Sequence, residues 1–157
     1  MRPLPLSNPI LTHAGSGRPA RILRAVSLAL AEPVGLTGQK YVLVTASLRA
    51  DAIMSVQQAR RSLEAGAAYV CSWGPGSPAM EESFDYASFL PELGVPFPYT
   101  VMTTSHTDKA VEEALWFVFW SAGPPDDQLD PISPILVLLD SASLEARCAE
   151  WVKTNRE

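Results

Sequence analysis

The sequence has few of the residues from which metal and redox sites are built. Its 157 residues include two cysteines, Cys71 and Cys148, and two histidines, His13 and His106. The cysteines lie far apart, without the short spacing of zinc ligands, and the soft donors are too few for a structural zinc site. We therefore expect no metal and no cofactor. Free thiols are typical of a reducing compartment, so the cytoplasm is the default location.

Long apolar runs and an excess of basic charge are also lacking. The longest apolar stretches, ALWFVFWSA and PILVLL, are too short to span a bilayer. The N-terminal segment has no continuous apolar region of the kind a secretory signal needs. A formal net charge of -5 disfavours a broad nucleic-acid footprint. We therefore expect neither membrane nor nucleic acid as a partner.

The chain contains enough apolar residues for one folded domain, since 47% of it is hydrophobic. Apolar strand patterns alternate with amphipathic helix patterns, which is typical of a parallel sheet covered on both faces. We predict an α/β fold, a three-layer Rossmann-like sandwich with a mostly parallel sheet of four or five strands. The single α/β domain covers 39–157. Its predicted strands are 40–48, 67–73, 99–105 and 135–139, and its predicted helices are 51–66, 79–90, 108–122 and 143–155, with Asp51, Asp108 and Ser143 starting three of them.

Residues 1–38 are predicted to form an N-terminal arm and one ambiguous element that pack on this domain. Residues 20–31 fit both a helical stripe and strand alternation, and we favour a helix ended by Pro33. Gly15-Ser16-Gly17-Arg18-Pro19-Ala20 superficially matches a dinucleotide-binding fingerprint, but no buried strand precedes it. A Gly-Ser-Gly hinge is the favoured interpretation, and nucleotide binding is a third functional hypothesis.

Polar residues follow each predicted strand. In a parallel sheet, ligands bind beyond the carboxyl ends of the strands, so these residues define the candidate site. The expected ligand-binding residues are Ser47, Arg49, Trp73, Thr103 and Thr104, with Thr45, Ser72, Ser105 and Ser141 beside them.

The candidate catalytic residues are Cys71, His106 and Asp140. In the sharpest hypothesis, His106 activates the Cys71 thiol and Asp140 orients the imidazole ring. The alternation of side chains along a strand instead puts Cys71 on a face with Tyr69 and Trp73, buried under a helix. His106 alone either caps a turn or acts as acid or base. These alternatives remain open.

The predicted helix 108–122 carries aromatic side chains on its outer face. Lys109, Glu113, Trp116 and Trp120 share one face by their spacing, while the apolar residues of the core side lie elsewhere on the helix. Either the N-terminal arm covers the two indoles, or Trp116 and Trp120 form a partner interface of the kind in which Trp is enriched.

Four segments, EAGAAYVCSWGP, YTVMTTSH, EEALWFVFWSA and PILVLLD, resemble an uncharacterised family of small bacterial α/β proteins, a domain of unknown function. The resemblance runs from about Tyr41 to Trp151. It implies the fold and a bacterial cytoplasmic setting, and it implies no activity. The family places an acid and a cysteine after Trp-Gly-Pro, where this chain has Gly76-Ser77. It also places a Trp before the histidine, where this chain has Ser105.

We predict a binding or protein-interaction module without catalysis, with homodimerisation as its simplest form. The alternative is an enzyme that acts on a small polar or phosphorylated ligand at the carboxyl ends of the strands, with His106 as acid or base. A small ligand is compatible with both hypotheses.

Overall fold

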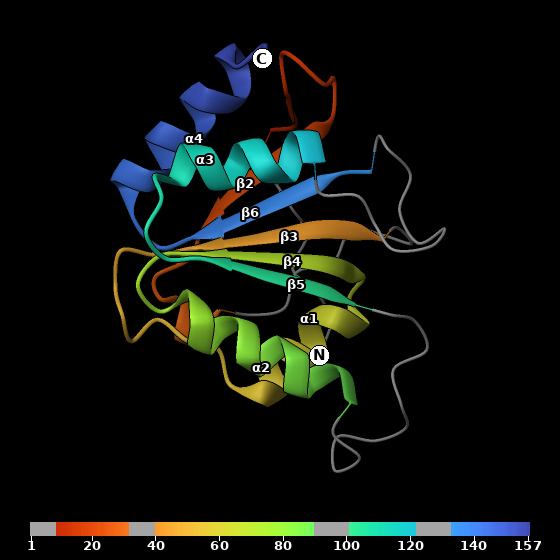
Figure 1. Ribbon diagram of the computed structural model, residues 1–157, viewed down its shortest axis with the longest axis vertical. Coiled ribbons are helices and arrows are strands. Elements are labelled where there is room, and N and C mark those ends of the chain that lie inside the picture. The colour runs from red at the N-terminus through yellow and green to blue at the C-terminus, as the bar shows by residue number, and fades with distance from the viewer. Residues whose placement is uncertain (1–8, 32–39, 90–100, 122–132) are drawn as a thin grey trace.

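Six strands form one mixed sheet at the centre of the molecule (Figure 1). The computed structural model describes residues 9–31, 40–89, 101–121 and 133–157. The order across the sheet is β1-β2-β6-β3-β4-β5, and only the β1–β2 pair is antiparallel. The strands are β1 Leu11–Thr12, β2 Pro19–Arg24, β3 Tyr41–Ala46, β4 Ala67–Trp73, β5 Met102–His106 and β6 Ile135–Leu139.

The prediction of a mostly parallel α/β sheet is confirmed. The four strands expected from the sequence, β6, β3, β4 and β5, are adjacent and parallel. All side chains of β3 and β6 are buried because helices cover both faces of the sheet. The sheet has one or two strands more than predicted, since β1 and β2 extend it beyond β6. Residues 99–100 of the predicted third strand lie outside the described residues.

Two layers of helices enclose the sheet, as Figure 1 shows. On one face, α3 Val111–Trp116 continues as the π-helical turn η3 Phe117–Ser121 and packs beside α4 Ala142–Thr154. On the other face lie α1 Val56–Glu64 and α2 Ser77–Phe89, with the short 3₁₀ helix η1 Leu28–Leu30 packed into the same core. The apolar residues accordingly form two cores, one on each side of the sheet. This arrangement is the predicted three-layer sandwich.

All four predicted helix starts are wrong by a few residues, and α2 begins at Ser77 instead of residue 79. α1 begins after Ser55, whose hydroxyl accepts from the backbone N–H of Gln58 at 3.1 Å, while the Gln58 side chain accepts from the N–H of Ser55. This reciprocal capping box satisfies two N–H groups at once, so it prevails over Asp51 four residues earlier. α3 follows Ala110 instead of Asp108, and α4 is capped by Ser141 instead of Ser143. The predicted helix ends at 90 and 122 lie outside the described residues.

The helical interpretation of 20–31 is wrong, because residues 19–24 form strand β2. Ile22 is buried and lies opposite Val137 of the parallel strand β6. Val26 and Leu30, which would belong to the buried stripe of a helix, are exposed. The open edge of β6 offers backbone hydrogen bonds to an extended segment, so pairing decides between the two patterns. Residues 1–8 and 32–39 of the predicted arm lie outside the described residues.

The glycine-containing segment after β1 is a turn and not the start of a helix. The backbone N–H of Gly17 donates to the carbonyl of His13 at 2.8 Å, and the backbone N–H of His13 donates to the carbonyl of Arg18 at 2.9 Å. Arg18 is buried, and its guanidinium donates to the carbonyls of Val118 and Ser133. The turn therefore joins two antiparallel strands and supplies a buried cation that holds η3.

His13 is fully buried in an aromatic cluster that ties this turn to the end of α4. Its ring stacks on Trp151 with centroids 4.9 Å apart and meets Trp120 edge-on at 5.3 Å. The Ser16 backbone N–H donates to Nδ1, so Nε2 carries the proton and donates to the Asn155 side-chain oxygen at 2.9 Å. Burial is the largest effect on the ring and lowers the pKa of His13 below its ordinary value of 6.5.

We predict that acid destabilises the protein through His13. Because the pKa of His13 is lower in the folded state, the unfolded chain takes up a proton near pH 6.5 that the folded chain does not. The contribution of His13 to the free energy of unfolding is therefore constant above pH 6.5 and falls as the pH drops below it. The measurement is the unfolding midpoint in urea from pH 7.5 to pH 5 in steps of about half a unit. As the pH is lowered, this midpoint falls less steeply in His13→Gln than in the wild type.

His106→Gln is measured beside it. The pKa of His106 is also lowered, but its ring packs against Phe117, away from the cluster around His13. The two variants each remove part of the pH dependence. A His13→Gln protein with the full wild-type slope would contradict the assignment of a buried, neutral His13.

Candidate functional site

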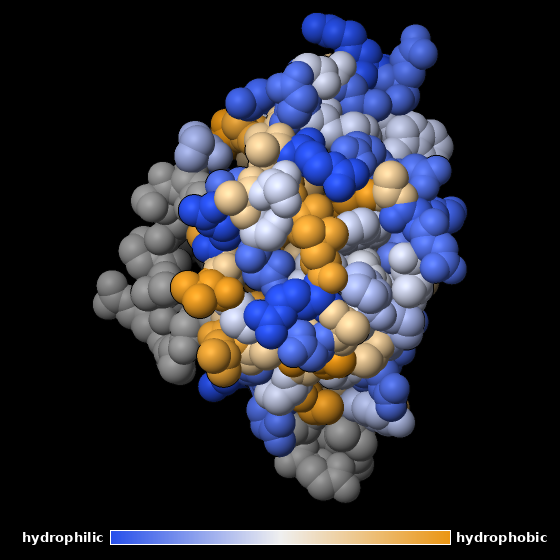
Figure 2. All heavy atoms as spheres, turned by 90° about the vertical axis from the view of Figure 1, so that its left-hand side faces the viewer, coloured by the Kyte–Doolittle hydropathy of each residue, from blue (hydrophilic) through white to orange (hydrophobic). Residues whose placement is uncertain are grey.

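The carboxyl ends of β6, β3, β4 and β5 bring the predicted site residues to one edge of the sheet. Across this edge lie Asp140 after β6, Ser47 after β3, Trp73 at the end of β4 and His106 at the end of β5. This edge is on the left in Figure 1, and Figure 2 turns it toward the viewer, with apolar patches among hydrophilic side chains. The sequence therefore predicted where these residues gather. The structure shows that they do not all touch.

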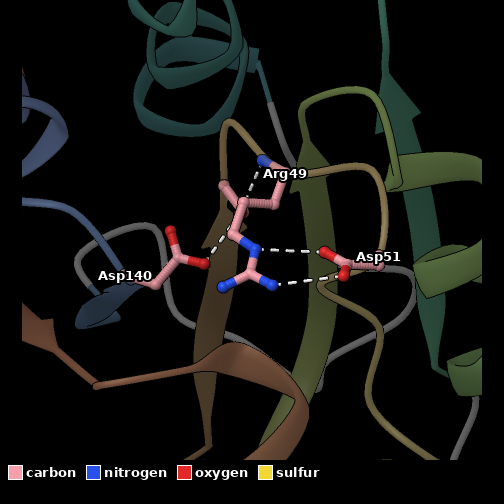
Figure 3. Close-up of polar contacts among 4 residues, drawn as sticks. Arg49, Asp51 and Asp140 are labelled. Carbon is pink, nitrogen blue, oxygen red and sulfur yellow. Dashed lines mark hydrogen bonds and ion pairs between the residues drawn. The ribbon is translucent and has the colours of Figure 1, made fainter.

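Ser47 connects the loops that follow β3 and β6. Its hydroxyl donates to the Asp140 carboxylate at 2.7 Å and accepts from the backbone N–H of Arg49 at 3.0 Å (Figure 3). Ser47 is buried, whereas Asp140 is only partly buried. The hydroxyl donates its proton to Asp140 and accepts from Arg49 with a lone pair. Ser47 therefore fixes both the Asp140 carboxylate and the path of the loop after β3.

Arg49 is paired with a neighbouring acid through two of its three guanidinium nitrogens. Its Nε and Nη2 groups donate to the two carboxylate oxygens of Asp51, both at 3.1 Å (Figure 3). The hydrogen bonds and charge of Arg49 lower the pKa of Asp51, and Asp140 adds a weaker attraction to Arg49. Both partners of this ion pair are exposed, so it adds little stability. One cation and two carboxylates give this part of the edge a net negative charge.

Trp73 and His106 form the other half of the edge, where they lie opposite each other in adjacent strands. The Trp73 indole N–H donates to the carbonyl of Lys109 at 2.7 Å. This bond ties the loop between β5 and α3 to the end of β4. The His106 ring packs 5.3 Å from that of Phe117. Burial lowers the pKa of His106, and the charge of Lys109 lowers it further. Its Nε2 atom is buried without a hydrogen-bond partner in the part of the chain that the structure describes.

The geometry gives no support to the Cys71–His106–Asp140 hypothesis. Cys71 is fully buried in the core beside Tyr69, as strand alternation predicted, and burial raises the pKa of its thiol to about 12. A thiol with such a pKa is protonated at neutral pH and is a poor nucleophile. Asp140 is bound to Ser47, and β6 lies three strands from β5, a separation of about 14 Å at the usual strand spacing.

The remaining predicted ligand-binding residues lie on the edge strand β5. The Thr103 hydroxyl donates to Asp85 of α2, so it fastens the strand to that helix. Thr104 lies opposite Cys71, and its hydroxyl is buried without a partner among the described residues. Neither Thr103 nor Thr104 lines a second feature of the edge, a small hollow between β3, β4 and the start of α2. The predicted site therefore divides into two parts.

A small hollow lies between the loop after β3 and the start of α2. Its lining includes Ser47, Arg49, Ser72, Trp73 and Ser77, with the remainder supplied by Leu28, Thr45, Ala52, Gly76 and Met80. It has room for about one water molecule, far less than an enclosed cavity for a drug-sized ligand. Three of the five expected ligand-binding residues, Ser47, Arg49 and Trp73, thus surround one space together with Thr45 and Ser72, while Thr103, Thr104 and His106 do not contribute to it.

Sequence reasoning did not identify Ser77, the least satisfied polar group in this hollow. Ser77 is 2% exposed, and its hydroxyl has no hydrogen-bond partner among the described residues. The strand-Gly-Pro-Gly-Ser-Pro pattern is a signal for it, since a strand that turns directly into a helix places the first helical side chain at the carboxyl edge. Whether that side chain finds a partner depends on packing, which the pattern does not encode.

Glu113, Trp116 and Trp120 of the predicted outer face are exposed and Val111 and Leu115 are buried, but Lys109 of that face lies before the start of α3. Trp116 is 46% exposed and Trp120 is 39% exposed. The Trp120 indole donates to Asn155 at 2.9 Å, and Gly15 lies so close to its ring that a Cβ there would overlap it. The N-terminal turn therefore covers part of Trp120, while Trp116 stays on the surface.

Two further searches concern metals and membranes. In the described ranges, no three His, Cys, Asp or Glu side chains gather closely enough to hold a metal ion. None of the helices seen in these ranges has the length and apolar character needed to cross a membrane.

The three-layer architecture with one polar strand edge places the protein among α/β domains. Residues 21–155 match the family described as "Domain of unknown function (DUF7684)", which covers most of the chain, and the protein belongs to this family. The match begins about twenty residues before the start of the resemblance seen in the sequence and includes four of the six residues of strand β2. No curated protein matches the chain.

We predict that Gly74→Ala is strongly destabilising. Gly74 has φ 116°, and a Cβ there would overlap the carbonyl oxygen of Ser47. Gly17→Ala is a matched control, because Gly17 has φ 75° with no atom within 4 Å of the added Cβ. Gly17→Ala isolates the backbone strain and costs about 1 kcal/mol, whereas Gly74→Ala adds the overlap and costs about 3 kcal/mol or more in urea unfolding. Equal losses would contradict the close approach of β3 to this turn.

Proposed function

We propose that the protein is a non-catalytic interaction module that pairs with a second copy of its own chain through α3 and α4. The observation that carries this proposal is the exposure of Trp116, a large aromatic side chain on a helix whose opposite face is fully buried. Trp is the residue most enriched at the energetic centres of protein interfaces. Neighbouring Trp120 is held rigidly by Asn155 and the His13 ring, so it presents a fixed apolar surface.

The charges around Trp116 favour a second copy over an unrelated partner. Glu112 of α3 and Arg147 of α4 form an ion pair at 2.6 Å, and both remain partly exposed. Because the two charges of this pair balance each other, the same pair on a second copy does not repel it, as a symmetric dimer requires.

In the part of the chain that the structure describes, the candidate catalytic groups Cys71, His106 and Asp140 do not come together. The described residues hold Asp140 away from His106 and bury the thiol of Cys71. The proposed setting is the bacterial cytoplasm that the sequence resemblance implies. The unpaired cysteines, Cys71 and Cys148, are both buried and fit a reducing compartment.

An enzyme acting on a small polar or phosphorylated ligand is the second candidate. Its support is the buried, unpartnered Nε2 atom of His106, whose lowered pKa keeps the ring neutral and able to accept a proton. This candidate needs a ligand that reaches between Trp73 and Lys109, where the Trp73 indole is already hydrogen-bonded. The α3–α4 interface therefore has the stronger support.

The dimer is tested by sedimentation equilibrium over a wide range of protein concentration. We expect reversible dimerisation of the wild type and a dissociation constant about 30-fold higher in Trp116→Ala, as for the loss of an interface anchor. Phe89→Ala is the matched control, because Phe89 is 58% exposed on α2, on the opposite side of the sheet. A wild type that is monomeric at all concentrations, or an equal effect of Phe89→Ala, would refute the proposal.

A further inference from the structure

Three hydrogen-bond donors without acceptors converge on the hollow at the start of α2. The Ser77 hydroxyl is buried and has no partner among the described residues. Ser72, 1% exposed, accepts from the Thr45 hydroxyl at 2.9 Å, which leaves the hydroxyl proton of Ser72 to donate. The backbone N–H of Gly76 has no acceptor in the parts of the chain that the structure describes. All three residues line the hollow.

These donors lie at the positive end of a helix. α2 runs for 13 residues from Ser77, and its aligned peptide dipoles favour negative charge at this end. Unpaired donors beside a helix N-terminus are the usual elements of an anion site. An acceptor placed in the hollow would satisfy the hydroxyl of Ser77, whose burial without a partner otherwise costs free energy.

The geometry selects one oxygen atom rather than a whole phosphate group. Pro75 and Pro78 have no N–H, and the N–H of Ser77 is used by the carbonyl of Gly74 at 3.0 Å. Among the described residues at the start of α2, only Gly76 both lines the hollow and has a backbone N–H without an acceptor, unlike the several N–H groups that surround a phosphate in glycine-rich loops. The hollow also holds only about one water-sized group.

The charges at the rim distinguish between anions. Arg49 lines the hollow, and its Nη1 group takes no part in the bonds to Asp51, so this nitrogen is available to a second oxygen. Asp51 and Asp140 lie close by and repel a doubly charged ligand more strongly than a singly charged one. A monoanion with two oxygens at one carbon satisfies both the hollow and Arg49.

Part of the wall of the hollow is apolar. Leu28, Ala52 and Met80 line it, and Leu48, which lies in the chain between the lining residues Ser47 and Arg49, is 55% exposed. Figure 2 shows apolar patches on this face of the molecule. Such a rim accommodates an aliphatic body attached to the anionic group.

We infer that this hollow binds the carboxylate of a small aliphatic monocarboxylate. One carboxylate oxygen accepts from Ser77, Ser72 and Gly76, and the other accepts from Arg49. The aliphatic part extends outward past Leu48. This site is on the strand edge, away from Trp116, so it stands independently of the proposed dimer.

The inference is tested by titrating the ¹⁵N-labelled full chain with acetate, hexanoate and inorganic phosphate and following amide chemical shifts. We expect shifts centred on Gly76, Ser77 and Arg49, with hexanoate binding about tenfold tighter than acetate because part of its chain is buried. Phosphate should bind more weakly than hexanoate. Phosphate binding as tight as that of hexanoate, or no shifts with any of the three, would overturn the inference.

Variants separate the proposed contacts from general effects on the protein. Ser77→Ala should weaken hexanoate binding about tenfold, while Ser88→Ala, on the same helix but outside the hollow, should leave it unchanged. If Ser77→Ala unfolds, Arg49→Gln serves in its place, since Arg49 is exposed and its loss should also weaken binding about tenfold. Equal affinity in the wild type and the folded variant would overturn the assignment of the hollow.

Discussion

The close approach of the Gly74 turn to the end of β3 determines how the strand edge is built. The N–H of Ser47 donates to the carbonyl of Trp73 at 3.3 Å, and the N–H of Gly74 donates to the carbonyl of His106 at 3.1 Å. These two bonds join β3, β4 and β5 just where the sheet ends. Because only glycine fits at position 74, the chain turns at once into α2 and places Ser77 beside Ser72.

Gly76 extends the same constraint by one turn. A Cβ at this position would lie 2.8 Å from the carbonyl oxygen of Ala50, so a larger residue would push the β3 loop away from the helix. The loop carries Ser47 and Arg49, and through Ser47 it holds Asp140. Two glycines around one proline therefore set the positions of the polar groups from four separate segments. The hollow therefore forms because Gly74 and Gly76 allow the turn after β4 and the loop after β3 to lie close together.

The sequence predicted the fold class because the decisive signals are local. β3, β4 and β6 are apolar runs bounded by turns, and α3 and α4 show clear periodicity with acidic residues in their first turns. β2 was missed because Ile22 fits both periods, and only the free edge of β6 decides for a strand. Asp51 was misassigned as a cap because its carboxylate fits that role equally well. In the folded protein it pairs with Arg49, while Gln58 makes Ser55 the better cap.

The candidate site was predictable in location but not in its contacts. Parallel strands place Ser47, Trp73, His106 and Asp140 at one edge whatever their order. The order β6-β3-β4-β5 decides which of them meet, and no short-range pattern in the chain encodes it. It puts Asp140 beside Ser47 and far from His106, which separates the groups that the catalytic hypothesis combined. The unsatisfied hydroxyl of Ser77 is likewise a result of packing, visible only once the start of α2 meets the loop after β3.

The central claim is that the turn after β4 presents unpaired donors to a hollow at the strand edge. A crystal structure of the protein grown with hexanoate tests it most directly. The account predicts a carboxylate oxygen within hydrogen-bond distance of Ser77 Oγ and the N–H of Gly76, with its partner oxygen at Arg49. A Ser77 hydroxyl bonded to another protein group, with the hollow closed and the ligand elsewhere, would contradict it.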